Sequence, residues 1–345
     1  MLNENIKNIL LKTVSQLMSP QKGILAADES NETAGKRLAD YEISNSEENR
    51  RLYRELFFAT TEIEKYVSGI IMYDETFWQK SNSGINYPQF LQEKGIVPGI
   101  KVDLGAKDFP NFPGEKITVG LDDLSIRAQK YFDNGARFAK WRAVIKIDQE
   151  NNLPTEACID ANCDAVAKYV GICQSIGLVP IVEPEVLILG NHSIEKSYEV
   201  TSAVLQKLFE KLKLFNAFIP GLILKTSMII QGDQNPNESS PQKIAEETVR
   251  VLKENVPVEI GGVVFLSGGQ TSVEATAHFD AIVEFGGLDF EIAFSYARAL
   301  QESALRIWKG KDENVDLARR EFLKRLKLNT LADSGDYDIK LEYLE

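Results

Sequence analysis

Lys225 lies at the end of a short aliphatic run in this 345-residue chain. The run Leu222-Ile-Leu224 precedes it directly, and a run this short and apolar predicts a strand that is buried on both faces. Burial disfavours the charged form of an ammonium group, and a neutral amine can attack a carbonyl carbon to form a Schiff base. The alternative is a lysine whose apolar stem is buried while its charge reaches solvent. The other polar residues of the chain decide which of these two environments surrounds Lys225.

A second lysine and two glutamates carry further groups that such a reaction needs. Lys140 and Arg142 alternate in Phe138-Ala-Lys-Trp-Arg142, and Glu183 and Glu185 flank a proline. We expect Lys140 and Lys225 to point into the same space, where two ammonium groups lower each other's affinity for a proton. Carbinolamine dehydration needs a proton donor and carbon–carbon cleavage needs a base, so Glu183 is expected to do acid–base work. Glu185 is expected to pair with Lys140 or Arg142.

Two stretches near the end of the chain have the composition of a phosphate site. Ser267-Gly-Gly-Gln270 contains two glycines, which let backbone N–H groups approach an anion at the start of the next helix. Ser295-Tyr-Ala-Arg298 adds a guanidinium group, which can hold phosphate through two parallel hydrogen bonds. A Ser-Gly-Gly sequence alone is typical of a plain turn. The two stretches together predict a phosphorylated ligand.

Eight short apolar runs recur along the chain, and amphipathic stretches typical of helices separate them. The runs cover residues 23–28, 68–74, 99–103, 138–146, 179–185, 222–228, 262–267 and 291–295, and helices are expected at 47–66, 155–175, 193–212, 241–253 and 273–285. This alternation predicts a parallel sheet with right-handed crossovers. Eight units favour an α/β fold with a single (β/α)8 TIM barrel over residues 1–330 and a short flexible tail over 331–345. A doubly wound open sheet is the alternative, but its usual glycine-rich first turn is missing.

A (β/α)8 barrel places its chemistry at the carboxyl ends of the strands. Polar residues collect at those ends of the predicted strands: Asp28, Asp74, Lys101, Asp103, Lys140, Arg142, Glu183, Glu185, Lys225, Ser267, Ser295 and Arg298. One such residue could simply be a satisfied member of the barrel interior. A whole set of buried charges is a costly way to build a core, so the set predicts a functional site.

Composition excludes several other classes of function. The net charge of -12 without a basic stripe argues against binding to nucleic acid or to an anionic membrane. No run reaches the roughly 18 to 20 apolar residues of a membrane span. Two histidines, and three cysteines without a Cys-x-x-Cys pair, argue against a zinc site or a disulfide scaffold. We therefore expect a cytoplasmic protein without a histidine-rich metal site.

The stretches that carry these residues resemble the blocks of class I, Schiff-base-forming fructose-1,6-bisphosphate aldolases, in the order of that family. They are Gly23-Ile-Leu-Ala-Ala-Asp-Glu-Ser30, Gly99-Ile-Lys-Val-Asp103, Phe138–Arg142, Val182–Val186, Leu224-Lys225, Phe265–Gln270 and Phe294–Gln301. The resemblance implies reversible cleavage of fructose 1,6-bisphosphate to dihydroxyacetone phosphate and glyceraldehyde 3-phosphate, in glycolysis and gluconeogenesis. It also implies a metal-independent lyase without a cofactor that forms a homotetramer.

The resemblance further implies a role for each matching residue. Lys225 would form the imine, with Glu183 as the main acid and base. Asp28 would steer the reacting hydroxyl and pair with a lysine, and Lys140 would assist carbinolamine chemistry. The implied substrate-binding residues are Ser267, Gly268 and Arg298 for the C1 phosphate, Lys101, Arg142 and Thr33 for the C6 phosphate, and in addition Ser295 and Ala297.

The chain departs from the family pattern at three places. Thr226-Ser227 stands where Pro-Asn is common, and Ala297 replaces a glycine beside a phosphate-binding amide. Tyr343 is only a candidate for the catalytic C-terminal tyrosine that many family members have, because Leu344-Glu345 follow it.

Two alternative functions stay open at this point. Another imine-forming barrel enzyme, such as a transaldolase or a deoxyribose-phosphate aldolase, would need one phosphate site, whereas Lys101 and Arg142 suggest a second. A catalytically inactive barrel that acts as a scaffold would be expected to lack Lys225, Glu183 or Asp28, and all three are present. The sequence also leaves open the preference between fructose 1,6-bisphosphate and fructose 1-phosphate, and the net direction of the reaction.

Overall fold

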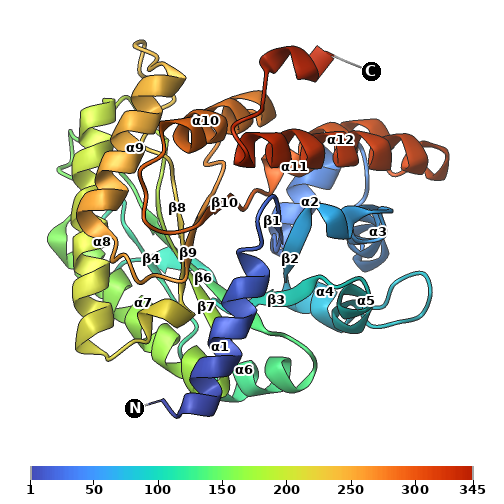
Figure 1. Cartoon of the computed structure of the whole chain (residues 1–345), viewed down its shortest axis with the longest axis horizontal. Helices are drawn as coiled ribbons and strands as arrows, with labels where there is room; N and C mark the ends of the chain where they lie inside the picture. The colour runs from blue at the N-terminus through green and yellow to red at the C-terminus, as the bar shows by residue number, and fades with distance from the viewer. Residues whose placement is uncertain (1, 344–345) are drawn as a thin grey trace.

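The protein is described by a computed structural model over residues 2–343, and its centre is an eight-stranded parallel barrel (Figure 1). The strands are β1 (Gly23–Ala27), β2 (Val67–Met72), β3 (Val97–Lys101), β6 (Phe138–Ile145), β7 (Val179–Val186), β8 (Ile223–Thr226), β9 (Gly262–Phe265) and β10 (Ile292–Phe294). They are hydrogen-bonded in that order, and each neighbouring pair is parallel. The N–H of Ala26 donates to the carbonyl oxygen of Tyr296 at 3.0 Å, which joins β1 to the chain just after β10. The predicted (β/α)8 barrel is confirmed over the open sheet.

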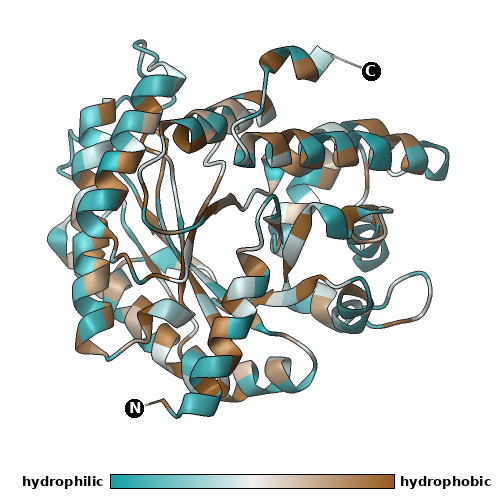
Figure 2. Ribbon diagram, in the orientation of Figure 1, coloured by the Kyte–Doolittle hydropathy of each residue, from teal (hydrophilic) through white to brown (hydrophobic). Residues whose placement is uncertain are grey.

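The helices surround the barrel (Figure 1). They are α1 (Glu4–Leu17), α2 (Asn31–Ala39), α3 (Glu47–Phe58), α4 (Asp74–Trp78), α5 (Tyr87–Glu93), α6 (Leu124–Asp133), α7 (Glu156–Ile176), α8 (Ile194–Leu214), α9 (Pro241–Asn255), α10 (Ser272–Phe285), α11 (Arg298–Trp308) and α12 (Val315–Asp333). Hydrophilic and hydrophobic residues alternate along them in Figure 2, and in α8 the buried Val200, Val204 and Leu208 recur every fourth residue. This period buries one stripe of the helix against the sheet.

Four of the five predicted helices agree with α7, α8, α9 and α10 to within about two residues. The fifth, predicted over residues 47–66, is wrong at its end, because α3 stops at Phe58. The hydroxyl of Thr60 then donates to the carbonyl of Leu56, and Glu62 adopts a left-handed conformation with φ 65°. These residues turn the chain so that it can enter β2. A short antiparallel pair of strands, β4 (Ala106–Asp108) and β5 (Lys116–Thr118), was not predicted.

The amino end of the barrel is closed by α1. Leu10, Val14 and Leu17 of this helix are buried in an apolar cluster with inward-facing residues of the strands. These strand residues are Ile24, Ile71, Phe138, Val179, Ile223 and Val264. Burial of this cluster contributes stability because apolar surface is removed from water.

The carboxyl-terminal segment packs on the outside of the barrel. The expected boundary at residue 330 falls inside α12, which continues to Asp333. Arg325 of α12 binds the Glu342 carboxylate at 2.6 Å, and the Tyr337 hydroxyl donates to the same carboxylate at 2.8 Å. Residues 344–345 of the expected tail lie outside the described residues. Among the described helices, none is both long and apolar enough to cross a lipid bilayer.

Candidate active site

A cavity of about 390 Å³ opens at the carboxyl ends of the barrel strands. The sequence-predicted residues that line it are Asp28, Thr33, Lys101, Lys140, Arg142, Glu183, Glu185, Lys225, Ser267, Gly268, Ser295, Ala297 and Arg298. They come from strands β3, β6, β7 and β8, from the loops after β1, β9 and β10, and from the first turns of α2 and α11. Residues scattered over most of the chain are therefore brought to one place by the barrel. A larger cavity of about 520 Å³ lies instead beside α1, away from these groups.

The period of the strands explains why so many charged groups share this cavity. Alternate residues of a strand face the same side, so Lys140 and Arg142 both point inward from β6, as do Glu183 and Glu185 from β7. The register places Arg142 directly beside Glu183. The same strands are apolar at the intervening positions, which pack against the outer helices.

The carboxylate of Glu183 bridges two lysines at the floor of the cavity. Its Oε1 atom lies 3.1 Å from Nζ of Lys225, and its Oε2 atom lies 2.7 Å from Nζ of Lys140. Lys225 is only 3% exposed, so its amine is held out of bulk water. This geometry excludes the snorkelling alternative, because the ammonium group does not extend into solvent.

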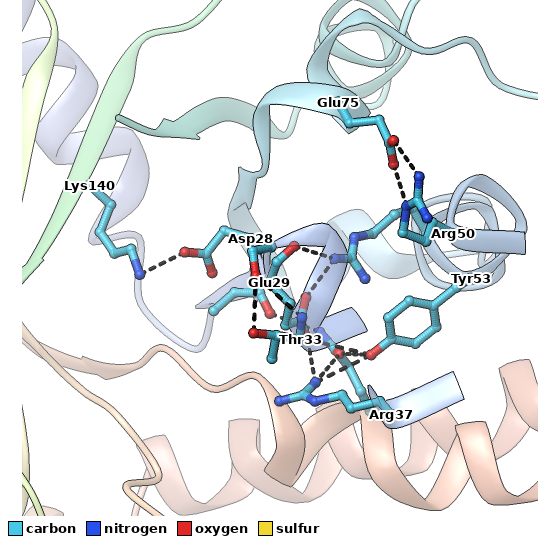
Figure 3. A network of polar contacts seen from close by, with 12 residues as sticks. Asp28, Glu29, Thr33, Arg37, Arg50, Tyr53, Glu75 and Lys140 are labelled. Carbon is cyan, nitrogen blue, oxygen red and sulfur yellow. Dashed lines mark hydrogen bonds and ion pairs between the residues drawn. The ribbon is translucent and has the colours of Figure 1, made fainter. Parts of the chain in front are cut away.

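Asp28 adds a second carboxylate to Lys140, with Oδ2 2.6 Å from Nζ (Figure 3). Burial alone would raise the pKa of Asp28, but the charges of Lys140 and Lys225 outweigh it and lower this pKa to about 2. Burial would likewise raise the pKa of Glu183, and the same two lysines lower it. Both carboxylates are therefore ionised at neutral pH.

The structure corrects the expectation for Lys140. Burial would lower the pKa of Lys140, but the negative charges of Asp28 and Glu183 outweigh burial and raise this pKa above its ordinary value. Lys140 is thus a permanent cation at neutral pH, and the nearby Lys225 does not make it neutral. The resemblance implied that Asp28 pairs with a lysine, but the sequence did not show that Glu183 brings a second carboxylate to the same ammonium group.

Two further cations lie toward the rim. Nε of Arg142 lies 2.5 Å from Oε2 of Glu185, which is the pairing expected for Glu185. Nζ of Lys101 lies 2.6 Å from Oδ1 of Asp103. The other oxygen of Asp103 accepts the backbone N–H of Arg142 at 3.2 Å, so this carboxylate connects β3 to β6. Each guanidinium or ammonium group is oriented by a carboxylate while it lines the cavity.

The opposite side of the cavity consists of backbone and hydroxyl groups. Gly268 and Gly269 have φ values of 53° and 94°, and within residues 2–343 their N–H groups donate no hydrogen bond to the protein. The buried Oγ of Ser295 likewise has no partner in this part of the chain. Ala297 has φ -104°, outside the positive-φ region that favours glycine, so this position does not require a glycine. Unpaired donors facing one cavity are suited to an anion, and Arg298 lies beside them on α11.

Arg37 and Glu29 also line the cavity, and the sequence analysis missed both. Arg37 contacts Glu29 and the hydroxyl of Tyr53 (Figure 3) and donates to Oε1 of Gln301 at 3.2 Å. Arg37 stands four residues after Thr33 on α2, so the two share one face of this helix. Because Thr33 is a predicted site residue, this four-residue spacing could have identified Arg37 as a second residue of the same site.

Two residues that the sequence analysis singled out, Asp74 and Tyr343, do not line the cavity. Asp74 begins α4, and its carboxylate accepts a hydrogen bond from the Tyr131 hydroxyl at 2.7 Å. Tyr343 is the last described residue. It ends the short 3₁₀ helix η4 (Ile339–Tyr343) and is 82% exposed. Its catalytic role stays a prediction. Among the described residues, no group of three or more histidines, cysteines or carboxylates is arranged to hold a metal ion.

The fold and this lysine–carboxylate cavity define a (β/α)8-barrel enzyme, and comparisons identify the family. The family model for class-I fructose-bisphosphate aldolase matches residues 9–344. A fructose-bisphosphate aldolase of Dictyostelium discoideum is 45% identical and covers 97% of this chain and 94% of its own length. Fructose-bisphosphate aldolase 4, cytosolic, of Arabidopsis thaliana is 46% identical over 95% of this chain and 83% of its own.

A solved structure agrees with these sequence relatives. The fructose-bisphosphate aldolase of Plasmodium falciparum, crystallised with TRAP and a small-molecule inhibitor, matches with a TM-score of 0.96 and 42% identity. The match covers 98% of this chain and 97% of that one. The chain belongs to the class-I fructose-bisphosphate aldolase family, a family of lyases.

Proposed function

We propose that this chain cleaves fructose 1,6-bisphosphate reversibly to dihydroxyacetone phosphate and glyceraldehyde 3-phosphate through a Schiff base on Lys225. The observation that carries the proposal is the contact between the buried amine of Lys225 and the Glu183 carboxylate, 3.1 Å apart at the floor of a cation-lined cavity. Family membership supports the reaction, which serves glycolysis and gluconeogenesis.

The first step is attack of the Lys225 amine on the ketone carbon of the substrate. Glu183 is the nearest base and accepts the proton that Lys225 must lose. The charges of Lys140, Lys225 and Arg142 all favour the Glu183 carboxylate, so the loss of one of them raises the affinity of Glu183 for the proton. As the C–N bond forms, a second proton moves from the nitrogen to the former ketone oxygen and gives the carbinolamine hydroxyl. Protonated Glu183 then gives its proton to this hydroxyl, which leaves as water, and the protonated imine forms.

Cleavage follows from the protonated imine. Glu183, again ionised, removes the proton of the C4 hydroxyl while Asp28 steers that group, and the C3–C4 bond breaks to release the aldehyde. The bonding electrons move to the iminium nitrogen and leave an enamine on the three-carbon fragment. Lys140 stays charged throughout and stabilises both carboxylates from between them.

Two phosphate-binding regions favour a bisphosphate. The glycine loop (residues 267–270), Ser295, Ala297 and Arg298 would bind the C1 phosphate. Lys101, Arg142 and Thr33 would bind the C6 phosphate, and Arg37 adds a further cation to the lining. A transaldolase-like enzyme would need only one of the two phosphate-binding regions. A scaffold protein would not need the buried lysines and carboxylates at the floor of the cavity.

Borohydride reduction in the presence of dihydroxyacetone phosphate tests the proposal. The reagent should fix the substrate to the protein, and peptide mapping should place the label on Lys225. The matched control is Lys140, which is equally buried but permanently charged. Label on Lys140 or on any other lysine would overturn the assignment.

Three broader properties complete the proposal. EDTA should leave the rate unchanged, and a large loss would contradict a metal-independent mechanism. Sedimentation should show a homotetramer, as the family resemblance implies. A cytoplasmic location is supported by the cytosolic Arabidopsis relative.

A further inference from the structure

A buried chain of hydrogen bonds lies behind the glycine loop. The carbonyl oxygen of Ser267 accepts two hydrogen bonds from Gln270, one from its backbone N–H and one from its side-chain Nε2, both at 2.9 Å. Oε1 of Gln270 lies 2.5 Å from Nδ1 of His278 on α10. Gln270 and His278 are 7% and 8% exposed, and neither is among the residues that line the cavity.

The chemistry of these partners fixes the direction of each hydrogen bond. A carbonyl oxygen can only accept, so the amide nitrogen of Gln270 must face Ser267 and its oxygen must face His278. That oxygen also can only accept, so Nδ1 of His278 must carry a hydrogen. Burial lowers the pKa of His278, which makes the neutral ring the form present at neutral pH. The neutral ring therefore holds its single proton on Nδ1.

The same glutamine connects the loop to the strand that carries the catalytic lysine. Nε2 of Gln270 lies 3.8 Å from the sulfur of Met228, which follows β8. On the other side of the loop, the N–H of Leu266 donates to the carbonyl of Thr226 at 3.0 Å. The loop is thus fixed at both ends, while Gly268 and Gly269 between them lack side chains that could restrict their backbone.

We propose that His278 is a positioning residue that, through Gln270, holds the glycine loop in the conformation that binds a substrate phosphate. The inference rests on the proposed function of that loop. A loop with two glycines loses much conformational freedom when it is ordered on a ligand, and a loop ordered beforehand binds more tightly. His278 does not touch Lys225 or Glu183, so its effect belongs to phosphate affinity and not to the chemical step.

The variants H278N and H278L separate the hydrogen bond from the packing. Asparagine places an amide N–H the same number of bonds from the backbone as Nδ1, whereas leucine fills similar space without a donor. Glycerol 3-phosphate carries a phosphate but no carbonyl, so its dissociation constant measures phosphate binding without imine formation. In H278L we expect this constant and the KM for fructose 1,6-bisphosphate to rise about tenfold, with kcat within about threefold of wild type. H278N should stay within about threefold in all three quantities.

A double-mutant cycle with Q270M shows whether His278 acts through Gln270. If it does, Q270M alone weakens glycerol 3-phosphate binding about tenfold, and H278L adds little in that background. Three outcomes would each overturn the proposal. They are an equal loss of glycerol 3-phosphate affinity in H278N and H278L, a lower kcat with unchanged KM in H278L, and full additivity of H278L with Q270M. If H278L does not fold, Q270M alone decides: unchanged phosphate affinity overturns the proposal. A wild-type protein that binds glycerol 3-phosphate but does not cleave the bisphosphate would contradict the proposed function and leave this test intact.

Discussion

The two ends of the barrel both bury side chains deeply, but these side chains are chemically opposite. At the amino end, Leu10 and Leu17 of α1 are completely buried among apolar side chains. At the carboxyl end, Lys140, Glu183 and Lys225 are buried almost as deeply. Burial stabilises the first group, because apolar area leaves water. Burial of the second group costs desolvation free energy, which the ion pairs offset only in part. The amino end is therefore expected to supply stability and the carboxyl end to supply chemistry.

Removing the lysine amine should give the largest effect on activity. In K225M, we expect kcat for fructose 1,6-bisphosphate to fall by at least about 10⁴-fold, because no imine can form. The thermal unfolding midpoint should change little, since Lys140 still pairs with the Glu183 carboxylate when the Lys225 amine is removed. Steady-state kinetics and calorimetry measure the two. Retained turnover in K225M would show that Lys225 does not form the imine. A large loss of stability would show that the carboxyl end of the barrel also supplies stability.

Neutralising the bridging carboxylate should have the next largest effect. E183Q keeps the shape of Glu183 but cannot exchange protons, so kcat should fall about 10²- to 10⁴-fold. KM should change little, because the phosphate groups are held elsewhere. The control is E185Q, which removes only the partner of Arg142 and should affect KM more than kcat. If the two variants show the same kinetic pattern, the division of labour between these glutamates is wrong.

A cavity at the amino end should give the reverse pattern. L17A removes a completely buried side chain, and we expect the free energy of unfolding to drop by about 2 to 5 kcal/mol. Denaturant titration measures this loss. At a temperature where the variant is folded, kcat should remain close to wild type, since α1 lies at the far end of the barrel. A fall in kcat comparable to that of E183Q would show that the ends are coupled.

The smallest predicted effect is a change in unfolding free energy in acid, caused by Asp28 at the carboxyl end of the barrel. Because the pKa of Asp28 is lowered to about 2 from 3.8, its contribution to stability is fully present above pH 3.8 and is lost as the pH falls toward 2. D28N lacks this titration. The difference in unfolding free energy between wild type and D28N should therefore shrink by about 1 kcal/mol between about pH 5 and about pH 3. A constant difference would show that Asp28 does not have its lowered pKa in the folded protein.

Sequence patterns predicted what strand periodicity controls. Asp28, Lys140, Glu183 and Lys225 could be placed at strand ends because apolar runs stop there, and the barrel then brings the ends together. The pairing of charges was less accessible. Lys140 receives one carboxylate from the end of β1 and one from β7, and this pairing decides its protonation. The contact between Gln270 and His278 also depends on how α10 lies against its own preceding loop, which periodicity does not report.

The hydrogen bond between Ala26 and Tyr296 has a consequence for how the protein is made. It joins residues separated by most of the chain, so β1 lacks its last neighbour until β10 has left the ribosome. Until then the nascent polypeptide exposes an open strand edge, which is a template for unwanted association. Ring closure of this kind also has a high contact order and is intrinsically slow. Biosynthesis of this protein therefore includes an interval in which protection from aggregation matters most.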